Sequence, residues 1–312
     1  MEIAELRDLL HNNIKLITDV DKYKKIISRS NNLKNFDLIN KVLVLSQCDN
    51  AVDIKTEDCW LLDGRKLNSK AKPIYLIAPV IKYSYIELET GETVDLTTIT
   101  SDELNKALEY NLIEKTETID DLYTIKVYDI RDTVSASDTE YVYKRKTTNS
   151  KELLEITENI MNVDIVLCED DFYSKQDKTI YLSKKPFRSL VYTLSRYISQ
   201  FIIDVYNEEC TDNSIYNNKY LFKLLKETVT YSIYTLLSDD NTVGLDFDFD
   251  LLDTLDYTSV LEVINLADLL VDNIEIINGT HSEAITDIHK IKKADALLNV
   301  LEANAVRNKL IG

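Results

Sequence analysis

Residues 59–79 read CWLLDGRKLNSKAKPIYLIAP, and this stretch holds the strongest local signals in the chain. Asp63-Gly64 is a dipeptide typical of a tight turn. Pro73 opens an apolar run from Ile74 to Val80, which predicts a short buried strand. The segment between them is rich in basic side chains, namely Arg65, Lys66, Lys70 and Lys72. The stretch therefore predicts a turn and a basic connection that lead into a sheet.

Helical spacing of apolar residues flanks this strand on both sides. The pattern predicts helices over residues 2–29, 37–46, 102–111, 151–161, 189–206, 221–237, 259–273 and 282–306. Further strands are predicted at 83–89, 123–130, 164–168 and 179–182. We therefore expect an α+β protein, with a small N-terminal α+β domain followed by a mostly helical domain that contains a short sheet.

A polar, charged segment at residues 131–150 is poor in large aliphatic side chains. A chain of 312 residues is long enough for two domains. We expect the boundary in this segment, with one domain over 1–135 and a second over 150–312.

The composition excludes several classes of protein. No apolar run approaches the roughly 20 residues that cross a bilayer, and the N-terminus lacks the features of a signal peptide. We therefore expect a cytoplasmic protein with no membrane partner. The four cysteines have no C-x-x-C spacing, and only three histidines accompany them, so a zinc ribbon or finger is not expected. Phosphate-binding glycine loops and G-x-S-x-G are missing as well.

The charge is unevenly distributed along the chain. The formal net charge is −18, with −5 on residues 1–150 and −13 on residues 151–312. Residues 15–82 nevertheless carry a net charge of +5. A basic segment within an acidic protein is either a nucleic-acid contact or an ordinary solvated surface.

The N-terminal part resembles the N-terminal domain of ArdC-type antirestriction proteins. The resemblance rests on Phe36, Asn40 and Gln47, on the Trp, Gly-Arg and I-x-I-x-A-P-like pattern of residues 59–79, and on Tyr128-Asp129-Ile130-Arg131-Asp132-Thr133. In that family the domain is associated with binding of single-stranded DNA. By resemblance, the candidate binding residues are Lys24, Lys25, Arg29, Lys34, Phe36, Asn40, Lys41, Trp60, Arg65, Lys66, Lys70, Lys72 and Tyr75, with Tyr23 as a further aromatic. Core packing is the alternative for the aromatic residues.

The second half resembles the zincin-like metallopeptidase domain of the same family. Arg196 and Gln200 stand where the two histidines of H-E-x-x-H would be, and Tyr197 replaces its glutamate. Glu227 occupies the position of the third, acidic ligand. Arginine stays protonated and cannot bind zinc. The resemblance therefore implies a degenerate domain without metal, cofactor or catalytic residues, in which Arg196 and Glu227 could form a buried ion pair.

Three functions remain open at this point. The first is an antirestriction-like, phage- or plasmid-type anti-defence protein that binds single-stranded DNA and lacks peptidase activity. The second is an inhibitor whose acidic surface imitates DNA and binds a host defence nuclease complex. The third is an inert scaffold. The sequence does not indicate the oligomeric state.

Overall fold

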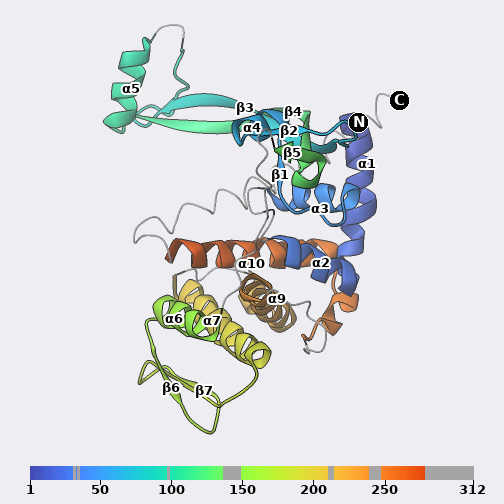
Figure 1. Ribbon diagram of the computed structural model, residues 1–312. Coiled ribbons are helices and arrows are strands. Elements are labelled where there is room, and N and C mark those ends of the chain that lie inside the picture. Colours follow the sequence, from blue (N-terminus) through green and yellow to red (C-terminus); the bar gives the residue numbers. More distant parts are fainter. Residues whose placement is uncertain are drawn as a thin grey trace.

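The computed structural model describes residues 1–30, 33, 36–96, 99–135, 149–209, 214–238 and 247–277. The fold is α+β, as expected, with helices dominating and three small sheets (Figure 1). The chain starts with α1 (Ile3–Ile14), the 3₁₀ turn η1 (Lys15–Thr18), α2 (Val20–Ser30) and α3 (Leu38–Gln47). The single helix predicted over residues 2–29 is thus broken at η1, which lets α2 turn onto other helices than α1. The predicted helix at 282–306 lies outside the described residues.

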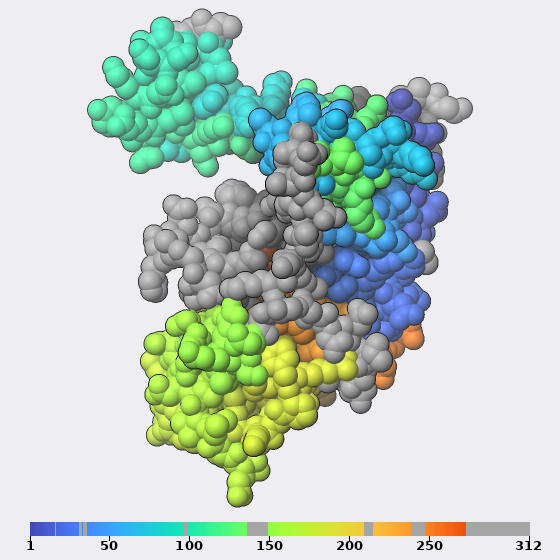
Figure 2. Space-filling view, viewed as in Figure 1, coloured from blue at the N-terminus to red at the C-terminus, as the bar shows by residue number. Residues whose placement is uncertain are grey.

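Two long antiparallel strands form a ribbon that dominates the N-terminal half. They are β3 (Ile74–Glu87) and β4 (Ile113–Asp129), and β1 (Ile54–Lys55) adds to β4 at the body end only. The register shifts between Val80 and Ile81, where a bulge separates the covered part of the ribbon from the rest. Beyond it, among the described residues, the two strands continue with only an isolated bridge from Thr93 to Ile86 beside them, and α5 (Ser101–Glu109) lies at their far end. We call residues 81–121 the distal arm; it extends away from the rest of the molecule (Figures 1 and 2).

Helix α3 closes the free edge of β3 with two amide side chains. Asn40 donates Nδ2 to the carbonyl of Ile77 (2.9 Å) and accepts the Ile77 N–H at Oδ1 (3.0 Å). Gln47 makes the same pair of bonds with Tyr75, at 2.8 and 3.0 Å. Pro79, the next residue with this orientation, has no N–H to satisfy. The two amides therefore stand in for a neighbouring strand. Asn40 itself is buried, and its backbone N–H is capped by Asp37.

The basic segment at residues 65–72 is attached to the end of β4. Residues 57–62 form α4 (Glu57–Leu62), a short helix in place of the predicted approach to a hairpin turn. Gly64 then reverses the chain with a φ of 71°. The short strand β2 (Arg65–Leu67) pairs antiparallel with β5 (Thr133–Ser135), which follows β4 after the 3₁₀ turn η3 (Ile130–Asp132). This pairing joins the segment before β3 to the segment after β4. We call this end of the ribbon, where β3 begins and β4 ends, its root.

The C-terminal half is a helical layer with a small mixed sheet. Its helices are α6 (Ser150–Met161), α7 (Phe187–Glu209), α8 (Ser214–Asn217), α9 (Lys219–Leu237) and α10 (Tyr257–Ile277), with the 3₁₀ turn η4 (Asp250–Thr254) before α10. The sheet has the order β6 (Asp164–Leu167), β8 (Thr179–Leu182), β7 (Phe172–Ser174), with β6 and β8 parallel. Within the described residues, no helix combines the length and apolar character needed to cross a membrane.

One apolar core runs through both halves of the chain. Its buried residues come from α1–α3 and the root of the ribbon as well as from α6–α10. Polar contacts cross the same boundary: the Tyr23 hydroxyl lies 2.5 Å from Thr228 Oγ1, and Lys41 Nζ lies 2.7 Å from Asp268 Oδ2. Ser30 also donates to Asp268, at 3.2 Å. Residues 136–148 of the expected boundary lie outside the described part. Helices α1 to α3, which precede this segment, share one core with α9 and α10, which follow it. Experiments on function therefore require the full chain.

Candidate functional site

Basic side chains gather on β2 and on the segment that connects it to β3. Lys66, Lys70 and Lys72 are exposed, and Arg65 is half-buried. Arg65 is held by Thr133, whose hydroxyl accepts from its Nε at 2.7 Å. The loop itself is fixed to η3: Asn68 N–H donates to the carbonyl of Asp132 (2.9 Å), and Lys72 N–H donates to the Asp132 carboxylate (3.3 Å). A fixed loop loses less conformational entropy on binding than a free one.

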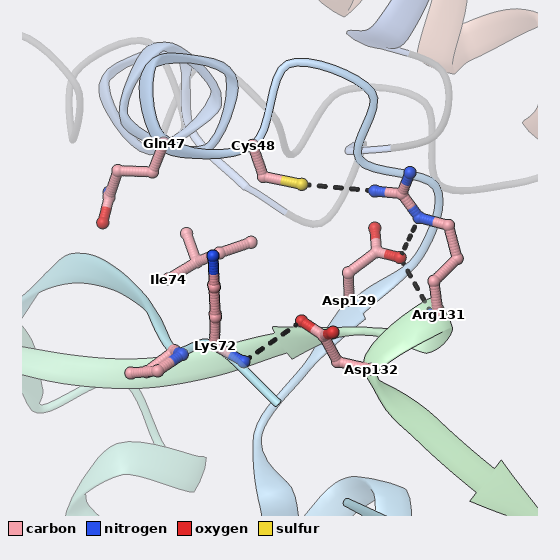
Figure 3. Close-up of a pocket in the computed structure, with 8 residues that line it drawn as sticks. Gln47, Cys48, Lys72, Ile74, Asp129, Arg131 and Asp132 are labelled. Carbon is pink, nitrogen blue, oxygen red and sulfur yellow. Dashed lines mark hydrogen bonds and ion pairs between the residues drawn. The ribbon is translucent and has the colours of Figure 1, made fainter. Parts of the chain in front are cut away.

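A pocket of about 300 Å³ opens beside this loop (Figure 3). It is lined by Gln47, Cys48, Lys72, Pro73, Ile74, Asp129, Arg131 and Asp132. Arg131 is the one basic residue of this pocket lining that the sequence did not predict as a binding residue. It followed a predicted strand, and only the antiparallel pairing of β2 with β5 brings it to the basic loop.

Arg131 is positioned by the buried carboxylate of Asp129. The Arg131 Nε lies 2.6 Å from Asp129 Oδ1, and this hydrogen bond raises the pKa of the guanidinium. Asp129 also accepts the backbone N–H of Val52 at 2.7 Å. The Arg131 side chain as a whole is 43% exposed. We call Arg65, Lys66, Lys70, Lys72 and Arg131 the basic edge; with Asp129 and Asp132 between them, it carries a net charge of +3.

Cys48 is a poor candidate for a nucleophile in this pocket. Its Sγ lies 3.2 Å from an Arg131 amino group. Burial nevertheless raises the pKa of the Cys48 thiol, and the charge of Asp129 adds to the rise while Arg131 opposes it. A thiol with a raised pKa stays protonated near neutral pH and reacts slowly. The pocket is therefore suited to holding a ligand rather than to covalent chemistry.

The aromatic residues expected to stack on bases are buried or packed against the core. Trp60 is 1% exposed, and its Nε1 donates to the carbonyl of Tyr128 at 2.9 Å. Tyr23 is fully buried, and burial raises the pKa of its hydroxyl. Phe36 and Tyr75 are half-buried against the same core. The alternative of core packing is the one this geometry favours.

Several expected basic contacts are also occupied by structural roles or lie elsewhere. Lys41 is buried in its ion pair with Asp268. Lys25 pairs with Asp49 at 2.5 Å, and the Nζ of Lys24 lies 5.6 Å from the ring centroid of Phe249. Arg29 shares α2 with these two lysines, and Figure 1 shows α2 beside α10, away from β2 and β5. Lys34 lies outside the described residues. Asn40 and Lys41 therefore have structural roles, and the exposed basic side chains that lie together are those of the basic edge.

The four positions that the family resemblance assigns to a degenerate zinc site lie on α7 and α9. Arg196 is exposed, with its guanidinium 5.8 Å from the ring centroid of Tyr192. Gln200 donates to Asp204 at 2.5 Å, and the Tyr197 ring lies 6.4 Å from that of Tyr173.

Glu227 is half-buried, and burial raises the pKa of its carboxyl while the charge of Arg196 opposes the rise. The ion pairs of the described residues do not include the expected buried pair between Arg196 and Glu227, because Arg196 turns to solvent and Tyr192.

This donor set does not fit a zinc ion. Arginine, tyrosine and glutamine replace the imidazole and carboxylate groups that zinc prefers, which leaves one acidic ligand. Among the described residues, no group of three or more His, Cys, Asp or Glu side chains is arranged to hold a metal. His281 and His289 lie outside that part of the chain.

The comparisons with known proteins give structural neighbours alone. No protein-family model matches the sequence, and no match is found among curated proteins. Two crystal structures of the antirestriction ArdC protein from R388 plasmid are similar. The metal-free structure has 12% identity and a TM-score of 0.43, covering 78% of this chain and 86% of that chain. The Mn(II)-bound structure has 11% identity and a TM-score of 0.41, covering 89% and 99%.

The chain is similar in fold to ArdC antirestriction protein. These neighbours carry the name of the family that the sequence motifs resemble. At this level of identity and overlap, no residue role passes from those structures to this chain.

Proposed function

We propose that the protein is a phage- or plasmid-type anti-defence protein that binds single-stranded DNA through the basic edge and has no peptidase activity. The observation that carries the proposal is the pocket that Lys72 and Arg131 line, next to the exposed Lys66 and Lys70 of the same stretch of chain. Phosphate contacts from such side chains supply sequence-independent affinity for nucleic acid. The motif resemblance of residues 36–79 to an ArdC N-terminal domain supports the same function.

The overall negative charge is compatible with this role because of screening. Nine of the eleven carboxylates of the distal arm lie beyond the bulge, with Asp120 and Asp121 at it, and the strand from Ile74 to Glu87 spans roughly 40 Å at about 3.3 Å per residue. The Debye length at physiological salt is only about 8 Å. A strand bound at the basic edge therefore experiences the local charge of +3 more strongly than the distant arm.

The binding prediction concerns a triple substitution in the loop. We expect Lys66→Ala, Lys70→Ala and Lys72→Ala together to weaken binding of a labelled single-stranded oligonucleotide by the full chain. The log–log salt dependence should become shallower by about 0.7 for each lost phosphate contact, thus by roughly 2. Fluorescence anisotropy across a salt series measures both quantities.

The matched control replaces three exposed lysines of the C-terminal half, Lys151, Lys184 and Lys219, by alanine. These changes alter the net charge equally and should leave the salt dependence unchanged. Equal losses in the two variants would show that only the overall charge matters. A native chain that ignores oligonucleotides at low salt would contradict the proposal.

The second prediction concerns metal. We expect the purified protein to contain no stoichiometric zinc and to cleave no peptide, because Arg196, Tyr197 and Gln200 are not the ligands or the base of a zincin. Elemental analysis and titration with zinc chloride measure this directly. The informative variant is Arg196→His, Tyr197→Glu and Gln200→His, which should gain zinc if Glu227 completes the site. One tightly bound zinc in the native chain would overturn the expectation.

A direct inhibitor of a host defence nuclease complex is the second candidate function. The observation that favours it is the strong acidity of the chain, which provides a surface able to compete with DNA for a basic groove. It takes precedence if the oligonucleotide experiment fails.

A further inference from the structure

The distal arm has a surface that its own fold does not explain. Of its described residues only Ile113 is buried, so the arm has almost no core. A two-stranded ribbon of this kind is marginally stable by itself. Large apolar side chains nevertheless face solvent on it, among them Tyr83, Leu88, Tyr110 and Leu112, with Tyr110 70% and Leu112 61% exposed. Exposed apolar surface of this extent indicates a contact with another molecule.

The arm is also the most acidic segment of the chain. It carries eleven acidic and three basic residues, a net charge of −8 within 41 residues. All eleven carboxylates belong to exposed residues. Such a surface repels nucleic acid and anionic membranes. Its partner must therefore combine basic groups with apolar groups.

The basic edge of the same chain has this combination. Leu61 and Leu62 precede it on α4 and are 56% and 87% exposed. Val134 is exposed and lies directly opposite Lys66 in the pairing of β2 with β5, so the two side chains share a face. Basic and apolar groups are thus mixed at the root of the ribbon, where the exposed Glu57, Asp58 and Asp63 beside the same leucines offset part of the positive charge. Acidic and apolar groups are mixed at its far end.

The charge therefore changes sign along the ribbon, from basic at its root to acidic at its far end. Because the arm points away from the body, its far end does not fold back on the basic edge of its own molecule (Figure 1). A second copy whose ribbon runs antiparallel to the first can make this contact instead. In that arrangement each acidic end reaches the basic root of the other copy, and the two contacts are equivalent by two-fold symmetry.

We propose that two copies of the chain pair through antiparallel ribbons, the distal arm of each resting on the basic edge of the other. The contact buries the exposed apolar side chains of both surfaces and neutralises their charges. It does not depend on the DNA-binding function, although it uses the same basic edge. Pairing and oligonucleotide binding should therefore compete.

Sedimentation velocity of the full chain, without nucleic acid, tests the pairing. A dimer is expected at low ionic strength and a monomer at high ionic strength. The edge variant Lys66→Glu, Lys70→Glu, Lys72→Glu should be monomeric, as should the arm variant Glu109→Lys, Glu114→Lys, Glu117→Lys. An equimolar mixture of the two variants restores both contacts and should sediment as a dimer. A chain carrying all six reversals should also dimerise.

The control reverses Lys151, Lys184 and Lys219 to glutamate, which changes the net charge as much as the edge variant does and should leave the dimer intact. All substituted residues are exposed, and circular dichroism verifies that each variant folds. A native chain that stays monomeric at low ionic strength overturns the proposal. So does a dimer that survives both reversals, because its interface then lies elsewhere.

Discussion

Replacing Asp268 by alanine is expected to lower the free energy of unfolding by about 3–5 kcal/mol. The reason is the lysine that remains. Lys41 is 5% exposed, and its ammonium lies 2.7 Å from the Asp268 carboxylate, which also accepts from Ser30. Without Asp268 this charge is buried and unpaired. Urea unfolding followed by circular dichroism measures the loss.

The matched control removes both charges, as Lys41→Met with Asp268→Leu. Replacing a buried ion pair by apolar side chains is often close to neutral, so most of the stability should return. A double variant as unstable as Asp268→Ala would show that α10 depends on the carboxylate for another reason.

The second large effect is expected from Trp60→Ala. Trp60 is 1% exposed, and removing a buried tryptophan typically costs about 3–5 kcal/mol. Trp60→Phe keeps an aromatic ring in the core but loses part of the ring volume and the hydrogen bond to Tyr128, so it should cost less than alanine. Thermal unfolding of both variants measures the difference.

The oligonucleotide affinity of the folded Trp60→Phe variant separates the two roles of this residue. We expect it to equal that of the native chain, since a buried ring does not stack on bases. An alanine variant that retains its melting temperature but loses affinity for single-stranded DNA would contradict the buried role, because base stacking is worth about 1–3 kcal/mol.

Much of the fold was predictable because its apolar patterns are strong. The strand after Pro73 and the helices α3, α7 and α9 have continuous or helically spaced apolar residues, and the structure confirms them. The length of the ribbon was not predictable. Apart from Ile113 and Ile119, residues 113–121 are Glu, Lys, Thr and Asp, so neither face of this strand is continuously apolar and the period-two signal is weak. The sequence predicted a strand at 83–89 and a helix at 102–111 within the arm, but its second long strand is visible only in the structure.

The candidate site was harder to predict than the fold, because local sequence does not reveal distant partners. Lys41 had the charge of a surface residue, but its carboxylate partner lies 227 positions away in the chain. Asn40 and Gln47 matched a motif associated with DNA, yet their amides bind the β3 backbone. Arg131 joined the basic edge only through strand pairing. The lysines of residues 66–72 are exposed, which both binding and an ordinary solvated surface require, so their role in binding stays a prediction.

The two amide side chains that α3 places along β3 also limit the period during folding in which this chain can aggregate. An open strand edge recruits strands from other molecules, and the apolar run from Ile74 to Val80 has the composition that favours such recruitment. Asn40 and Gln47 occupy the groups that an incoming strand would use. A newly made chain is therefore exposed to strand exchange at this edge only until α3 docks. Replacing Asn40 or Gln47 would prolong that interval. We therefore expect such a variant to show a low yield of soluble protein before any change in binding.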